Sequence, residues 1–98
     1  MSEVIEKVIL GDGTEIAGAA AASDGNWMIW IMIRDYNSPY NTVAGLIAAL
    51  CAEGATETIT YEANGREEAA FTGYTEIDTV RSDSDGMCSA RLRRPDRR

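Results

Sequence analysis

The sequence predicts an α+β fold: a mainly antiparallel sheet of five to seven strands built from hairpins, with one helix packed on a face. Short runs rich in β-branched residues are separated by Asp-Gly and Asn-Gly turns, and a single stretch shows helical periodicity. With 98 residues, of which 45% are hydrophobic and 26% charged, the chain suits one globular domain. We assign residues 1–90 to this domain and residues 91–98 to a basic C-terminal tail, which we expect to fray.

The chain opens with a predicted hairpin. Val4–Leu10 is rich in β-branched residues and too short to form a stable helix, so it predicts a strand. Gly11–Thr14 supplies residues that tolerate positive φ, as a tight turn requires. Glu15–Ala20 would return antiparallel to the first strand. Alanine and glycine have low β propensity, however, so Ala17–Ala22 fits either a strand or an irregular connection.

A continuous apolar run follows the second turn, Ser23–Asn26. This run, Trp27–Ile33, contains no polar residue, which is typical of a central strand covered on both faces. We expect it to anchor the core. Residues 34–40 have the composition of a loop, and Pro39 also biases the preceding residue away from helix.

The single predicted helix spans Thr42–Ala52. Either Asn41 or Thr42 can cap it, since both carry a side-chain oxygen that accepts from a first-turn N–H group. Gly54 is placed to end it. Five apolar residues follow helical spacing and should form one stripe packed on the sheet: Val43, Leu46, Ile47, Leu50 and Cys51.

Two further hairpins complete the sheet. Thr56–Ala63 and Arg66–Tyr74 flank Asn64-Gly65, a strong signal for a two-residue hairpin turn. Thr75–Arg81 and Met87–Leu92 then form the last predicted pair.

Charge is distributed unevenly along the chain. The net charge is −7, yet residues 1–90 hold only 4 basic against 15 acidic side chains. An acidic body of this kind disfavours nucleic acid as a partner. Five of the nine basic residues occupy the last eight positions: Arg91, Arg93, Arg94, Arg97 and Arg98. This tail either contacts phosphates or an acidic protein surface, or is simply a basic, frayed end.

No catalytic, cofactor-binding or metal-binding residue is predicted. Histidine, the commonest general base and transition-metal ligand, is absent. Cys51 lies on the predicted apolar stripe and Cys88 in a predicted strand, so both are interpreted as small buried side chains rather than nucleophiles. Tyr36, Tyr40, Tyr61 and Tyr74 are interpreted as rim or core residues.

The acidic residues offer two weaker candidates. Glu67 with Glu68, or Asp83 with Asp85, could supply the paired carboxylates of a small hydrolase. The stretch Asp83-Ser84-Asp85-Gly86 also resembles part of a calcium loop. That match fails because Arg81 and Leu92 stand where such a loop needs acids. We therefore interpret these carboxylates as turn residues and solvated strand faces.

The compartment is predicted from what the sequence lacks. The first residues show no signal-peptide pattern, and the longest apolar run has seven residues, too few to cross a membrane as a helix. Two widely separated cysteines fit neither a disulfide framework nor a Cys-x-x-Cys pair. These features predict a cytoplasmic protein without membrane association.

The order of strands and turns resembles a group of known proteins. The segments Val8–Ile16 and Glu57–Glu62 and the turn at Asp85-Gly86 are similar to short proteins encoded in phages and prophages of gut Firmicutes. Those proteins commonly lie among tail or other structural genes and have no assigned activity. The resemblance implies a structural role, including incorporation in a phage particle, and it transfers no site residues.

Three classes of function remain after these exclusions. The first is a non-enzymatic phage structural or protein-interaction protein that acts through self-association or a protein partner. The second is an acidic regulatory binder that mimics nucleic acid on a basic host protein. The third is a small hydrolase.

Overall fold

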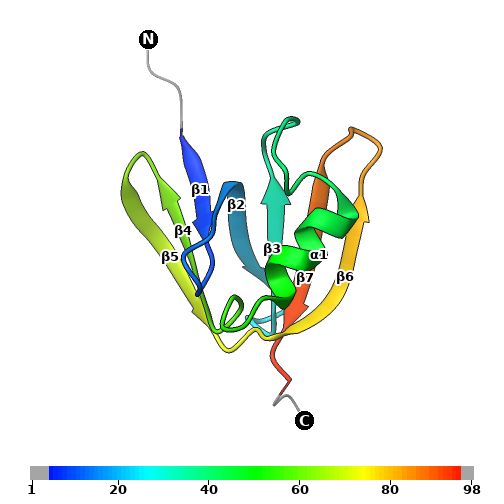
Figure 1. Ribbon diagram of the computed structural model, residues 1–98. Helices are drawn as coiled ribbons and strands as arrows, with labels where there is room; N and C mark the ends of the chain where they lie inside the picture. The colour runs from blue at the N-terminus through cyan, green and yellow to red at the C-terminus, as the bar shows by residue number, and fades with distance from the viewer. Residues whose placement is uncertain (1–4, 96–98) are drawn as a thin grey trace.

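The computed structural model describes residues 5–95, which form seven strands and one helix (Figure 1). In chain order these are β1 (Glu6–Ile9), β2 (Glu15–Ser23), β3 (Met28–Ile33), α1 (Val43–Cys51), β4 (Thr58–Ala63), β5 (Arg66–Thr72), β6 (Glu76–Ser82) and β7 (Cys88–Arg93).

All seven strands belong to one antiparallel sheet in the order β5-β4-β1-β2-β3-β7-β6. β2 joins its two parts: Glu15–Ala17 pair with β1, and Gly18–Ser23 pair with β3. In Figure 1 the two parts form the arms of a V, with β5, β4 and β1 on one arm and β3, β7 and β6 on the other. We call these the β4 arm and the β3 arm.

The turns are made as their residues predict. In the β4–β5 turn, Asn64 and Gly65 have φ values of 54° and 81°, the positive range that this hairpin type needs. Asn64 also bonds to the chain before β1: its Oδ1 accepts from the Ile5 N–H group, and its own N–H group donates to the Ile5 carbonyl. The hairpin and the start of β1 are thereby held together.

The core lies between the two arms, on what we call the inner face of the sheet. Ile29, Ile31 and Ile33 of β3 are almost completely buried there and share one cluster with Ile16 and Ile59 of the β4 arm. α1 packs against β6 and β7 and contributes Leu46 and Leu50, which are 0% and 3% exposed. The hydrophobic core is therefore continuous across both arms.

Most predicted elements are found. The sheet is mostly antiparallel and carries one helix, in agreement with the predicted outline, although a nine-residue helix is a small α contribution. α1 has Thr42 as its N-cap, whose Oγ1 accepts from the Gly45 N–H group at 2.9 Å, and Ala52 as its C-cap. Ala17–Ala22, for which the sequence left two alternatives, is part of β2.

Two predictions about the strands are wrong. The run Trp27–Ile33 is not covered on both faces: Met28, Trp30 and Met32 remain half-buried, because only the inner face of β3 meets the rest of the core. Residues 91–93 were also wrongly assigned to a frayed tail, because β7 continues through Arg93 in register with β3 and β6. Arg97 and Arg98 lie outside the described residues.

Candidate interaction surfaces

The side of the β3 arm that faces away from the core is occupied by tryptophan, methionine and arginine. Strand register determines this arrangement, because paired residues in a sheet project to the same face. Met28, Trp30 and Met32 of β3 pair with Arg93, Arg91 and Ser89 of β7, respectively. We call this side of β3, β7 and β6, together with its flanking loops, the outer face.

Trp30 lies at the centre of the outer face beside two guanidinium groups. The Cζ atoms of Arg81 and Arg91 lie 5.3 and 5.2 Å from the centre of its ring. Arg94 makes similar contacts with Trp27 and Tyr74, at 5.5 and 5.6 Å. A cation within about 6 Å of an aromatic ring is attracted to its π electrons. These contacts therefore fix the rings and the arginines relative to one another.

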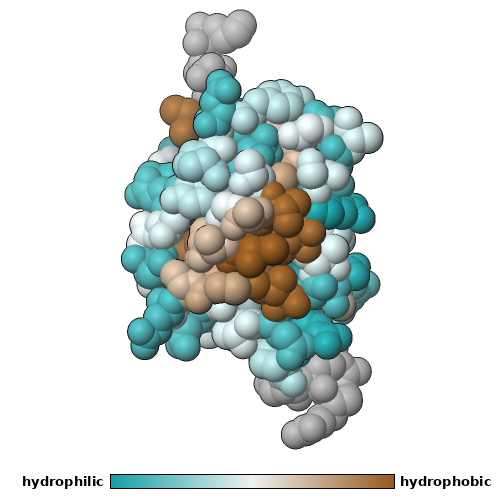
Figure 2. All heavy atoms as spheres, turned by 45° about the vertical axis from the view of Figure 1, so that its right-hand side comes forward, coloured by the Kyte–Doolittle hydropathy of each residue, from teal (hydrophilic) through white to brown (hydrophobic). Residues whose placement is uncertain are grey.

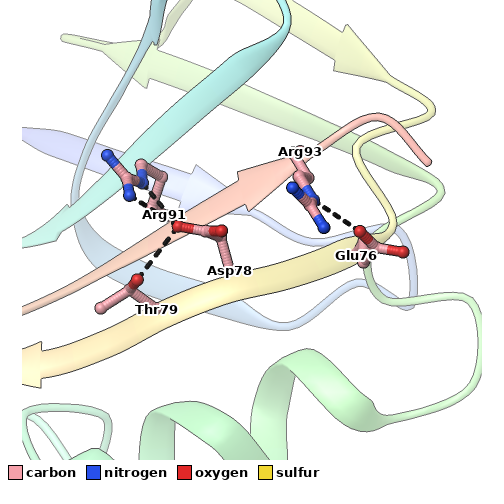
Figure 3. Close-up of polar contacts among 5 residues, drawn as sticks. All are labelled: Glu76, Asp78, Thr79, Arg91 and Arg93. Carbon is pink, nitrogen blue, oxygen red and sulfur yellow. Dashed lines mark hydrogen bonds and ion pairs between the residues drawn. The ribbon is translucent and has the colours of Figure 1, made fainter. Parts of the chain in front are cut away.

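Carboxylates on or next to β6 pair with Arg81, Arg91 and Arg93, and Figure 3 shows the pairs of Arg91 and Arg93. Asp78 Oδ2 accepts from Arg91 Nε at 2.8 Å and lies 2.7 Å from Arg91 Nη2. Arg93 Nε donates to Glu76 Oε1 at 2.5 Å. Arg81 Nε lies 2.9 Å from an oxygen of Asp83. Each of these three arginines is thus oriented by a carboxylate.

These contacts alter the acid–base properties of the groups that make them. Hydrogen bonds from Arg91 and then from Thr79 keep the pKa of Asp78 below its ordinary value of 3.8. The hydrogen bond to Glu76 raises the pKa of Arg93. Three arginines of the outer face, Arg81, Arg91 and Arg93, therefore stand in ion pairs.

Three shallow hollows follow one another along the outer face, with volumes of 310, 300 and 330 Å³. The first lies near Trp27, Met28 and Arg93, the second around Trp30, and the third extends from Met32 toward Tyr36. All are open to solvent and at the small end of the range for ligand pockets. They suit side chains of a docked protein better than an enclosed small molecule.

A second apolar surface lies on α1. Leu46 and Leu50 point into the core, but Val43 and Ile47 are 37% and 38% exposed, and Cys51 is exposed as well. Figure 2, in which the side bearing α1 comes forward, shows an apolar patch surrounded by hydrophilic residues. The predicted stripe of five residues is therefore only partly buried, because the sheet covers one narrow side of the helix.

The predicted carboxylate pairs are not gathered into one site. Glu67 and Glu68 are exposed on β5, and Asp83 and Asp85 follow β6, the strand at the opposite edge of the sheet. Asp85 Oδ1 accepts from the Met87 N–H group at 2.9 Å, as in an Asp-Gly turn. Within residues 5–95, no group of three or more His, Cys, Asp or Glu side chains is arranged to hold a metal ion.

The cysteine prediction is confirmed for one residue and wrong for the other. Cys88 is buried on the inner face of β7, as its strand position predicted. Cys51 is exposed because it lies on the side of α1 that turns away from the sheet. Neither cysteine is bonded to the other.

The tyrosines support the framework around these surfaces. Tyr74 is buried, and its hydroxyl donates to the Asn26 carbonyl. Tyr36 donates to the Asp85 carbonyl at 3.0 Å and so fastens the loop before α1 to the β6–β7 turn. Tyr61 donates to Glu6, and this hydrogen bond raises the pKa of Tyr61. Tyr40 packs against the core.

Sequence reasoning missed the outer face, although a signal for it was present. In β3 the isoleucines alternate with Met28, Trp30 and Met32, so large flexible and aromatic side chains share one face of the strand. Arg91 and Arg93 show the same two-residue spacing in β7, where they had been assigned to the tail. Alternation within an apolar run, together with paired arginines, could have identified the surface.

No helix within residues 5–95 combines the length and the apolar character needed to cross a membrane. The sequence matches no family model, and neither a curated protein nor a solved structure matches the chain.

Proposed function

We propose that the protein is a non-enzymatic interaction protein that binds another protein through its outer face. One observation carries the proposal: the outer face holds both tryptophans, all three described methionines and five of the seven described basic residues. Trp, Met and Arg are enriched at protein–protein interfaces, and Trp and Arg often dominate the binding energy.

The rigidity of this surface supports the same proposal. Arg81 and Arg91 are each held by a carboxylate and lie over the ring of Trp30. Side chains that are already ordered lose little conformational entropy when a partner docks. The remaining N–H groups of each guanidinium can then bond to carboxylate or carbonyl oxygens of the partner.

The test compares the effect on binding of replacing an arginine on the outer face with that of replacing an arginine elsewhere on the sheet. Full-length tagged protein is used to recover partners from host lysate, and the recovered protein is then purified and its affinity measured directly. Arg81→Ala should weaken binding about tenfold or more, whereas Arg66→Ala, on β5, should leave it unchanged. Equal affinities for the two variants, or no saturable binding by the purified candidate, would refute a role for the outer face.

The phage or prophage setting is part of the proposal and is supported by the resemblance described above. In that setting the protein would act in the cytoplasm or become part of a particle. Sequencing the genes beside its own tests this directly. Tail or capsid genes as neighbours would support the setting, and a bacterial housekeeping operon would contradict it.

The charge distribution favours one alternative, an acidic binder of a basic host protein. Outside the outer face, the described residues include ten carboxylates and only Lys7 and Arg66 as basic side chains. Binding through that acidic surface would weaken steeply as salt concentration rises. Binding through the largely neutralised outer face would depend weakly on salt, so one salt titration separates the two.

A further inference from the structure

On the outer face, an apolar side and a charged side flank the strand β7. Register places Met32 of β3, Ser89 of β7 and Arg81 of β6 in one row across the three strands. Trp30, Met32, Ser89 and Arg81 line the same hollow, which lies over β7 because Ser89 is small. A segment seated there therefore meets apolar side chains toward β3 and a guanidinium group toward β6.

Two arginines of this face keep hydrogen-bond donors for a partner. Arg81 and Arg93 are 58% and 51% exposed, and within residues 5–95 each contacts its carboxylate through Nε. Arg91 is less exposed and contacts Asp78 through both Nε and Nη2 (Figure 3). Because a guanidinium has five N–H donors, the Nη groups of Arg81 and Arg93 remain available to bind carboxylates.

Charge favours an acidic segment on this face and opposes it elsewhere. The outer face holds five arginines against four carboxylates, which belong to Glu76, Asp78, Asp83 and Asp85. The other described residues hold ten carboxylates and two basic side chains. An acidic segment is therefore repelled by most of the molecule and attracted to the outer face.

Backbone hydrogen bonding favours a helix over an extended segment. From Ser89 to Arg93, β7 pairs with β3 on one side and with β6 on the other, so its backbone groups bond to its neighbours. An extended segment lying on this face would find no strand edge to pair with, and its own N–H and C=O groups would lose water without gaining partners. A helix bonds its backbone groups internally.

The spacing of the two arginines suits a helix that lies along β7. Arg81 stands opposite Ser89, four residues before Arg93, so the two positions are about 13 Å apart along the strand. In a helix, residues i and i+7 lie on one side, about 10.5 Å apart along the axis. The long side chains of arginine and glutamate span the remaining difference.

We propose that the segment of the partner that binds the outer face is an acidic, amphipathic α-helix. Its apolar stripe packs on Trp30 and Met32, and two of its carboxylates, two turns apart, bind Arg81 and Arg93. This inference rests on the proposed function, because it specifies the chemistry of the partner segment that the outer face takes.

The first test uses synthetic peptides as probes and the full chain as receptor. One peptide has about 20 residues and a hydrocarbon crosslink that keeps it helical, because short helices are marginal in water. It carries a stripe of leucines, with two glutamates two turns apart beside the stripe. The matched control has the same composition, but its glutamates stand on the side opposite the stripe. The first peptide should bind at least about tenfold more tightly in a calorimetric titration, and equal affinities would contradict the role of the arginines.

A third peptide tests the helical conformation. It is the first peptide without the crosslink and with prolines in place of two interior residues, which prevents helix formation. It should bind at least about tenfold more weakly than the first peptide. Binding as tight as that of the first peptide would overturn the helix and favour an extended segment.

An exchange of charges assigns the contact to the two arginines. The chain carrying both Arg81→Glu and Arg93→Glu should lose at least about tenfold in affinity for the first peptide. A peptide with lysines in place of the two glutamates should bind this variant better than it binds the unmodified chain, a coupling that a general loss of structure does not produce. No such gain would overturn the contact. Arg66→Glu, on β5, is the matched control and should bind the first peptide like the unmodified chain.

The natural partner separates this inference from the proposed function. If the first peptide shows no binding up to about 1 mM while the natural partner still loses affinity for Arg81→Ala, the helix is wrong and the outer face keeps its role. If the natural partner binds Arg81→Ala and Arg66→Ala equally, the proposed function is refuted, and the inference falls with it.

Discussion

Asp78 is the residue that fixes the arginine beside Trp30. The register of β6 against β7 shifts between Ile77 and Thr79, which leaves Asp78 without an opposite residue. Such bulges redirect side chains. Here the carboxylate contacts two nitrogen atoms of the Arg91 guanidinium, and it also accepts from the Thr79 hydroxyl at 3.0 Å. One irregular residue therefore organises the centre of the outer face.

The ionisation of Asp78 should make stability depend on pH. Its pKa is lowered in the folded protein, so the ionised carboxylate favours folding. This contribution is fully present well above 3.8 and is lost as pH falls through the lower, folded-state pKa. The variant Asp78→Asn should therefore be less stable than the unmodified chain at neutral pH, and the two should converge in acid. Urea unfolding from about pH 7 to pH 2 checks this, and a pH-independent difference would contradict it.

The two cysteines show which residues could be placed from sequence. Alternation along a strand has a period of two, so a single buried neighbour fixes the side on which Cys88 lies. The apolar side chains of a helix can span a wide arc of its surface, and periodicity alone does not reveal how much of that arc a sheet will cover. Cys51 belongs to the predicted stripe, but the sheet reaches only Leu46 and Leu50.

At the level of single elements, α1 contains a glycine that its packing requires. A Cβ atom on Gly45 would lie 2.3 Å from the carbonyl oxygen of Pro39 and 2.8 Å from Thr42 Oγ1. Both distances are far shorter than van der Waals contact. The loop before the helix therefore approaches the helix backbone so closely that no side chain fits between them.

Gly45→Ala should destabilise the protein, against the expectation from helix propensity. In an open helix position, replacing glycine with alanine gains about 1 kcal/mol. Here the new methyl group would displace the backbone at Pro39 or break the Thr42 cap. Ala48→Gly, at an exposed position of the same helix, is the control and should lose about 1 kcal/mol. Urea unfolding measures both, and a gain in stability for Gly45→Ala would show that the loop yields without cost.

Element boundaries were predictable where turn chemistry was explicit. Asn64-Gly65 fixed the β4–β5 hairpin, and Thr42 fixed the start of α1. Whether each face of β3 is covered could not be predicted in the same way. An all-apolar run is compatible with burial on both faces, and the three-dimensional path of the chain shows that Trp30 has no second layer above it.

At the level of the whole molecule, the two arms share one core and should unfold together. The tryptophans report on the β3 arm alone, because both lie at or beside β3. Ile59 lies on β4, in the other arm, and is fully buried in the common cluster. A substitution at Ile59 should therefore change the unfolding transition that tryptophan fluorescence reports, because both arms share one core.

Ile59→Ala should lower the free energy of unfolding by about 2–5 kcal/mol, the usual cost of such a cavity. The decrease should be the same whether unfolding is followed by tryptophan fluorescence or by far-ultraviolet circular dichroism, because a single cooperative transition makes all probes coincide. An unchanged fluorescence midpoint alongside a shifted dichroism midpoint would mean that the arms unfold independently.

The overall outline of the sheet followed from local signals, but the candidate surfaces did not. Hairpin turns determine which neighbouring strands pair, whereas the pairing of β1 with β4 and of β3 with β7 joins strands far apart in the chain. The pairing of β3 with β7 places Arg91 beside Trp30. The alternation in β3 and the spacing of Arg91 and Arg93 in β7 are local signals, but the pairing that joins them into one outer face is a product of topology.

The small side chains of β2 also restrict how the sequence can evolve. From Gly18 to Ala22 no side chain is larger than a methyl group, and a Cβ on Gly18 would lie 2.3 Å from the Met32 carbonyl oxygen. Because this segment carries the chain from one arm to the other, larger replacements at Gly18 or Ala20 would crowd the core. Descendants of this sequence should therefore keep small residues at Gly18 and Ala20, whereas the exposed Ala21 and Ala22 can be replaced by larger ones.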